Sequence, residues 1–173
     1  MGLFRKKKNN KSEDNSAELK LSEYDNIWSK FCFLDETGSL NNKNEPFFSV
    51  GIIKMTQPYY LNNKTLYERN KRNFHHEMHF NKLSRKNISF AKFAVEAFLD
   101  TQNTKFYSYS IDKQGEYFQR EFHSDPWKAY EEITIKLIEK GVLLQNEILI
   151  LLADHVTTPS DIKFEVTVKR AIN

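Results

Sequence analysis

The feature that most constrains the fold of this chain is a run of apolar residues near its C-terminal end. Residues 147–153 read Glu-Ile-Leu-Ile-Leu-Leu-Ala, so every side chain after the first is apolar. A strand of this kind has no polar face to present to water, and such runs are typical of parallel strands buried on both faces. The run therefore predicts an α/β fold in which this strand is parallel to a neighbour.

Strand-like and helix-like segments alternate before this run. Segments rich in β-branched and aromatic residues predict strands at 27–34, 47–55, 74–83 and 106–111. Helical spacing of apolar residues predicts helices at 60–73, 84–100, 125–141 and 160–172. The first three strands should form a meander and the last two should run parallel to their neighbours, which predicts a mixed sheet flanked by helices.

Local signals mark the ends of the predicted helices. Ser84 is a candidate N-cap for the first long helix, and Asp125 followed by Pro126 is a typical start for the next one. Gly141 is a candidate C-terminal stop. Ser160 is the first residue of the Ser-Asp pair that should begin the final helix.

Composition divides the chain into a leader and a domain. Residues 1–25 are polar and charged, and they predict a disordered leader, whereas residues 26–173 have the composition of one α/β domain. Much of the excess positive charge lies in the leader, whose basic residues are Arg5, Lys6, Lys7, Lys8 and Lys11 within its first eleven positions. Such a segment is either a solvated tail or an arm that binds phosphates.

The compartment is predicted to be the cytoplasm. The N-terminus lacks the apolar stretch of a signal peptide, and no apolar run reaches the roughly 18 residues that a membrane span requires. The single cysteine, Cys32, excludes an internal disulfide and is expected to be a buried, inert thiol. No membrane partner is expected, and the sequence leaves the oligomeric state open.

Acidic residues follow three of the predicted strands. Asp35, Asp112 and Asp154 each come at the end of a strand, and Glu77 precedes the first long helix. If the strands run in one direction, the three aspartates meet at the carboxyl edge of the sheet, where open α/β sheets bind ligands. Clustered carboxylates are suitable ligands for Mg²⁺ or Mn²⁺. An aspartate after a strand is also common for structural reasons, because it suits turns and helix N-caps.

A histidine-rich segment offers a competing site. On a strand, His75, Glu77 and His79 would share one face, and two imidazoles with a carboxylate are suitable ligands for zinc or iron. The alternatives are a polar surface strand, or one histidine that assists the carboxylate site as a proton shuttle or phosphate contact.

Several of these segments resemble one protein family. The matching segments are 31–38 with Asp35-Glu36-Thr37-Gly38, the aromatic strand 47–51, Glu77-Met78-His79-Phe80, residues 109–113 ending in Asp112-Lys113, and residues 150–154 ending in Asp154. Together they resemble the bacterial domain-of-unknown-function 3800 family over roughly residues 30–173, with Thr37 where that family typically has serine.

The resemblance implies a ribonuclease H-like fold and a metal-dependent nuclease that cleaves RNA or DNA. It implies that Asp35 is the central metal ligand, that Glu77 and Asp112 complete the Mg²⁺ or Mn²⁺ site, and that Asp154 is a supporting acid. We predict that these four acids are the catalytic residues. The predicted substrate contacts are Glu36, His79 and Lys113.

The chain departs from the family pattern at its C-terminal end. Family members usually continue to a further strand and to a helix that supplies another acid, whereas this sequence ends at Asn173 within a predicted helix. The expectation is a domain that lacks its C-terminal part. The alternative function is therefore a non-catalytic module that binds nucleic acid or a protein through an incomplete ribonuclease H-like site.

Overall fold

The computed structural model describes residues 28–42, 44–144, 147–154 and 163–173. The strands in this part are β1 (Trp28–Thr37), β2 (Phe47–Met55), β3 (Thr104–Asp112) and β4 (Glu147–Ala153). The α-helices are α1 (Pro58–Lys71), α2 (Ile88–Asp100), α3 (Glu116–Phe122), α4 (Pro126–Leu137) and α5 (Phe164–Ile172). A 3₁₀ turn, η2 (Phe80–Lys82), precedes α2, and a π-helical turn, η3 (Ile138–Val142), extends α4. The predicted leader at 1–25 lies outside the described residues.

The strands form one mixed sheet in the order β3-β2-β1-β4. The β1/β2 and β2/β3 pairs are antiparallel, and β4 is parallel to β1. The predicted α/β class with a mixed sheet is confirmed. The prediction that both late strands run parallel to their neighbours is right for β4 and wrong for β3, because β3 forms hydrogen bonds to the antiparallel β2.

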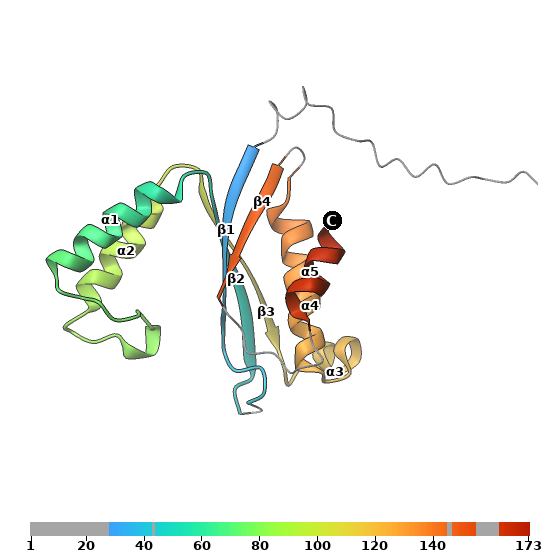
Figure 1. Ribbon diagram of the computed structural model, residues 1–173. Helices are drawn as coiled ribbons and strands as arrows, with labels where there is room; N and C mark the ends of the chain where they lie inside the picture. The colour runs from blue at the N-terminus through green and yellow to red at the C-terminus, as the bar shows by residue number, and fades with distance from the viewer. Residues whose placement is uncertain (1–27, 43, 145–146, 155–162) are drawn as a thin grey trace, which may run out of the picture.

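The hydrophobic core lies on one face of this sheet. Figure 1 shows α4 and α5 covering that face, with α3 at its lower end. Alternate residues of the central strands, among them Cys32, Leu34 and Phe48, pack against α4, where Tyr130 and Ile133 are completely buried. Removal of this apolar surface from water supplies most of the stabilisation of the fold.

The start of α4 follows the sequence prediction. The side chain of Asp125 accepts hydrogen bonds from the backbone N–H groups of Trp127 and Lys128, and Pro126 occupies the first helical turn. The helical segment ends one residue after the predicted stop at Gly141, because η3 continues as far as Val142. Cys32 is buried, as expected.

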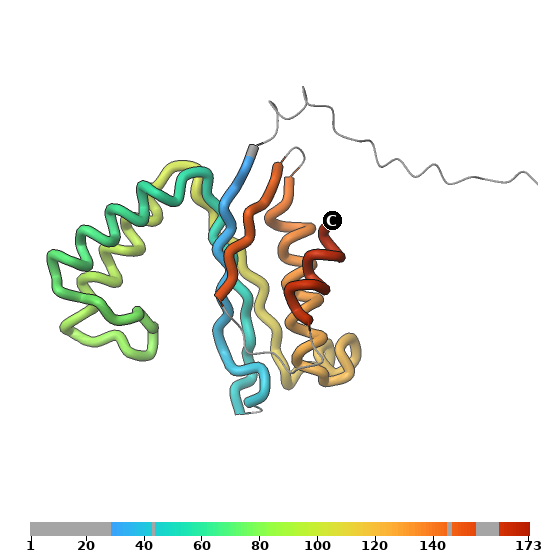
Figure 2. Tube along the Cα trace, in the orientation of Figure 1, coloured from blue at the N-terminus to red at the C-terminus, as the bar shows by residue number. Residues whose placement is uncertain are grey.

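On the other side of the sheet, α1 and α2 form a helical hairpin that projects away from the strands (Figures 1 and 2). Its two helices are joined by a few contacts. The ring of Phe74, just after α1, lies 5.0 Å from that of Phe90 in α2, and Arg72 at the end of α1 donates a hydrogen bond to the hydroxyl of Ser89. No side chain of α1 is buried, so the hairpin adds little to the core.

The segment between the two hairpin helices corrects a prediction. Residues 74–83 were expected to form a strand, but they form a loop that contains η2. Alternation of side chains stabilises a strand only when a neighbouring strand supplies hydrogen bonds, and none pairs with this segment among the strands described. The N-cap prediction at Ser84 is also wrong, since α2 begins at Ile88 after Asn87.

The apolar strand β4 has the predicted direction but not the predicted burial. It lies at the edge of the four described strands, with β1 as its neighbour. Ile148 and Leu151 point to opposite faces and are 44% and 38% exposed. In the described part of the chain, neither face of β4 is therefore fully covered by other elements. The last helix, α5, begins at Phe164, and the predicted start at 160–161 lies outside the described residues.

Candidate functional site

Three predicted site residues lie at the same edge of the sheet. Because β1, β3 and β4 run in one direction, their carboxyl ends meet at one edge, which carries Asp35, Asp112 and Asp154. The common direction of the three strands, on which the prediction depended, is therefore present, but Asp35 is level with Ser108 of β3 and not with Asp112. How close they come depends on the register of the strands.

Asp35 and Asp154 lie at the same level of two neighbouring strands. Leu34 of β1 is the register partner of Ala153 of β4, and each aspartate is the next residue along its strand. Paired parallel strands lie about 4.8 Å apart, so the two aspartate backbones are close neighbours. Both side chains are exposed, and Asp35 Oδ1 accepts a hydrogen bond of 2.9 Å from the backbone N–H of Glu36.

Glu36 adds a third carboxylate from the opposite face of β1. The Tyr130 hydroxyl, which comes from α4, donates a hydrogen bond of 3.2 Å to Glu36 Oε2. Burial raises the pKa of Glu36, the Tyr130 hydrogen bond lowers it, and the negative charges of Asp35 and Asp154 raise it further. Glu36 is thus close enough to both aspartates to experience their charge. We call Asp35, Glu36 and Asp154 the acidic cluster.

Tyr130 is held as a hydrogen-bond donor to this cluster. Burial raises the pKa of its phenol well above the ordinary value, and the charge of Glu36 raises it further. The phenol therefore remains protonated at any physiological pH. Its ring stacks on Phe164 of α5 at 4.2 Å and meets Phe48 of β2 edge-on at 5.4 Å, so its position is determined by the core.

Asp112 does not join the acidic cluster. Its register partner on β2 is Phe47, whereas the partner of Asp35 is Gly51, four residues further along the same strand. With strand spacings of about 4.8 Å and a rise of about 3.3 Å per residue, Asp112 lies about 10 Å across and about 13 Å along the sheet from Asp35. Its carboxylate accepts a hydrogen bond from the backbone N–H of Gln114 at 2.9 Å, which is a turn-forming role.

Lys113 is also occupied by a structural contact. Its ammonium group donates hydrogen bonds to the backbone oxygens of Ser39 and Asn42, in the loop between β1 and β2. Its backbone N–H donates to Pro46 O at 2.6 Å. Lys113 therefore ties the end of β3 to the neighbouring loop, and its predicted contact with substrate would require these bonds to break.

Glu77 and the histidines lie in the loop of the helical hairpin. The Glu77 side chain is 78% exposed, and its Oε2 is 3.1 Å from His79 Nε2. His75 has a different partner, Asn73 Oδ1, at 3.0 Å. The shared strand face on which the zinc or iron hypothesis depended is absent, because this segment is not a strand.

A metal site with three protein ligands is not preformed in the described residues, where no group of three His, Cys, Asp or Glu side chains could hold an ion. The acidic cluster offers a pair of adjacent aspartates with Glu36 behind them. Magnesium commonly binds through one or two carboxylates and keeps several waters. The oxygen donors of Asp35 and Asp154 fit this kind of site.

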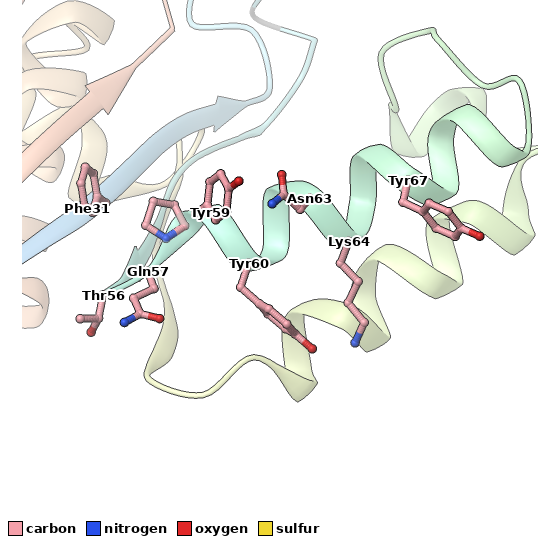
Figure 3. Close-up of a pocket in the computed structure, with 9 residues that line it drawn as sticks. Phe31, Thr56, Gln57, Tyr59, Tyr60, Asn63, Lys64 and Tyr67 are labelled. Atoms are coloured by element: carbon pink, nitrogen blue, oxygen red, sulfur yellow. The ribbon is translucent and has the colours of Figure 1, made fainter.

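A second feature lies where α1 leaves the sheet, and the sequence reasoning missed it. A pocket of about 820 Å³ opens between the first turns of α1 and Phe31 of β1 (Figure 3). Its lining contains the tyrosines 59, 60 and 67 and the amine of Lys64. The spacing of Tyr60, Lys64 and Tyr67 is visible in the sequence. The helix prediction at 60–73 relied on the apolar positions Leu61, Leu66 and Tyr67 and did not consider this spacing.

Comparison of the chain with models of protein families, with curated proteins and with solved structures gives no match. Within the described residues, the helices are too short or too polar to cross a lipid bilayer.

Proposed function

We propose that the chain is a metal-dependent hydrolase of nucleic-acid phosphodiesters and that its reaction takes place at the acidic cluster. One observation carries the proposal: Asp35 and Asp154 occupy the same level of neighbouring parallel strands at the carboxyl edge of the sheet. Parallel α/β sheets bind ligands at this edge.

The arrangement of the strands supports a ribonuclease H-like fold within this proposal. The strands β1, β2 and β3 are antiparallel neighbours, with the helical hairpin inserted between β2 and β3, and β4 returns after helices α3 and α4 to lie parallel to β1. The Asp35-Glu36-Thr37-Gly38 segment that resembles the domain-of-unknown-function 3800 family lies at the C-terminal end of β1, an inner strand of the described sheet.

The assignment of residues differs from the one based on sequence. We assign Asp35 and Asp154 as the ligands of Mg²⁺ or Mn²⁺, and we leave out Glu77 and Asp112, which lie elsewhere on the molecule. A divalent ion bound there would activate a water molecule and stabilise the negative charge that develops on the phosphate.

Glu36 lies on the face of β1 opposite Asp35, where the hydrogen bond from Tyr130 fixes its orientation. Its proposed role is electrostatic, because its negative charge adds to that of the two aspartates and favours a bound divalent cation. The exposed faces of Asp35 and Asp154 leave room for a phosphodiester to approach the cluster.

The test is cleavage of single-stranded and duplex RNA and DNA with Mg²⁺ and with Mn²⁺. Asp35→Asn and Asp154→Asn should each lower the cleavage rate at least about 100-fold, since loss of a ligand removes several kcal/mol of transition-state stabilisation. Asp112→Asn is the matched control. It removes an aspartate from a strand that runs in the same direction and should leave the rate within about threefold, because this carboxylate accepts a hydrogen bond in its own turn and lies about 13 Å along the sheet from Asp35.

The proposal is wrong if the folded wild-type protein cleaves none of these substrates with either metal. It is also wrong if Asp112→Asn abolishes the activity while Asp35→Asn and Asp154→Asn retain it.

A second candidate function is a non-catalytic module that binds nucleic acid, which the basic and aromatic side chains of α1 favour. A module of this kind should bind nucleic acid with the same affinity in the presence and absence of Mn²⁺. Calorimetric titration of Mn²⁺ distinguishes the two candidates, because the hydrolase should bind the ion through Asp35 and lose this binding in Asp35→Asn.

A further inference from the structure

Helix α1 carries a stripe of aromatic and basic side chains on one face. Tyr60, Lys64 and Tyr67 are spaced by four and three residues, which brings them to the same side of a helix. Figure 3 shows the three side chains projecting from the same side of α1. The two tyrosines are 57% and 67% exposed, so packing in the core does not account for them. We call these three residues the α1 stripe.

The α1 stripe forms part of the wall of the pocket beside β1. The lining combines flat rings with groups that can donate and accept hydrogen bonds. The rings belong to Phe31, Tyr59, Tyr60 and Tyr67, and the polar groups to Thr56, Gln57, Asn63 and Lys64. Rings on which a base can stack, next to amides and hydroxyls that can bind its edge, are the features that accommodate nucleobases.

The net positive charge of the hairpin indicates a negatively charged partner. Residues 58–101 contain eight Lys or Arg residues and four Asp or Glu residues, so the hairpin is more basic than the rest of the chain. The ammonium of Lys64 lies 5.6 Å from the centre of the Tyr60 ring, so cation and ring are presented together. Exposed tyrosines beside cations suit a single-stranded polyanion with unpaired bases better than an apolar peptide.

The pocket and the acidic cluster lie along the same strand. Phe31, Phe33 and Asp35 alternate with the buried Cys32 and Leu34, so they share the face of β1 that is turned away from the core. Four residues of a strand span about 13 Å, which is about four nucleotides at the stacked spacing of about 3.4 Å.

We propose that the α1 stripe and the pocket beside it bind the unpaired bases of a single-stranded nucleic acid, about four nucleotides from the phosphate that lies at the acidic cluster. This inference rests on the proposed function for one element, the position of the reacting phosphate at the acidic cluster. The binding itself requires neither metal nor cleavage, so the two can be tested separately.

The experiment measures binding of a short fluorescein-labelled single-stranded oligonucleotide by fluorescence anisotropy, with the full chain and with excess chelator. Tyr60→Ala and Tyr67→Ala should each weaken binding by about tenfold, which is the usual effect of losing one base-stacking ring. Tyr60→Phe and Tyr67→Phe should bind like the wild type, because the ring is retained. None of these changes touches the core, since α1 has no buried side chain, and circular dichroism checks the fold.

Lys64→Ala tests the charge of the stripe. It should reduce the slope of log affinity against log salt by about 0.7, which is the contribution of one phosphate contact on a single strand. Lys128→Ala is the matched control, because it removes one positive charge from α4, on the covered face of the sheet. That variant should leave both affinity and slope unchanged.

The inference is overturned if the wild type does not bind the oligonucleotide, if it binds the matching duplex more tightly, or if the tyrosine-to-alanine variants bind like the wild type. Binding to vesicles of phosphatidylcholine and phosphatidylserine in place of the oligonucleotide would also overturn it and would identify a membrane surface as the partner. If binding depends on the α1 stripe but no substrate is cleaved with Mg²⁺ or Mn²⁺, the proposed function fails and the binding site remains.

Discussion

At the scale of single residues, the contact between Glu36 and Tyr130 links the core to the candidate site. Glu36 has a raised pKa in the folded chain, so its ionised form is less favourable there than in the unfolded chain. Protonated Glu36 therefore stabilises the folded chain, and this contribution is fully present below the ordinary glutamate pKa of 4.5. The contribution is lost as the pH rises through the raised pKa of the folded chain. The hydrogen bond from Tyr130 offsets part of that loss.

We predict that Tyr130→Phe lowers the free energy of unfolding at pH 7 by about 1–2 kcal/mol, because it removes the donor to a charged, half-buried carboxylate but retains the ring. Below pH 4.5 the cost should be smaller, since Glu36 is then protonated in the folded and unfolded chains. Urea unfolding at both pH values measures this difference. In a Glu36→Gln background, the loss of unfolding free energy caused by Tyr130→Phe should become independent of pH. If this loss still increases with pH, a titrating group other than Glu36 is responsible for the pH dependence.

At the scale of elements, the helical hairpin contrasts with the helices that cover the sheet. α4 buries Tyr130, Ile133 and Leu137, whereas α1 buries no side chain. The hairpin is held together mainly by α2, where Phe90 is 4% exposed and packs on Phe74. Elements with few buried apolar contacts open at low free energy, and binding surfaces are commonly found on them.

We predict that the backbone amides of α1 exchange with solvent on the order of 100-fold faster than those of β2, because opening the hairpin exposes little of the core. Hydrogen exchange followed by mass spectrometry or NMR measures this. Phe90→Ala should accelerate exchange throughout α1 and α2 and leave β2 unchanged. Equal acceleration in β2 would contradict the prediction, because the hairpin and the sheet would then unfold as one unit.

At the scale of the whole molecule, the two faces of the sheet are unequally covered. Helices α4 and α5 cover one face, and the hairpin extends away from the other (Figure 1). The apolar strand β4 lies at an edge of the described sheet and is partly exposed on both faces. An exposed apolar edge strand offers unpaired backbone groups and apolar side chains to a second chain.

We predict that Ile148→Lys reduces concentration-dependent association of the protein and changes the free energy of unfolding by no more than about 0.5 kcal/mol, because Ile148 is 44% exposed. Sedimentation velocity over a range of concentrations measures the association. Leu99→Lys, which places a lysine at a 72% exposed position of α2, is the control and should leave association unchanged. An equal effect of both variants would indicate general repulsion and not a role of the β4 edge.

Part of the candidate site was predictable from the sequence because it depends on short-range patterns. Asp35 and Asp154 stand at the ends of apolar strands, and the direction of a strand determines which edge its last residue reaches. Asp112 reaches the same edge, but the register of β2 separates it from the others. Glu77 was placed by assuming a strand, and that segment instead joins two helices that project from the sheet.

The sequence by itself determined the strands and helices with strong local signals, including β1, β2, the Asp125-capped start of α4 and the direction of β4. Only the tertiary structure decided which residues meet, because strand register and the placement of Tyr130 over Glu36 depend on contacts between residues far apart in the chain. Burial was decided in the same way, because the apolar strand β4 lies at an edge of the described sheet, where few neighbours cover it.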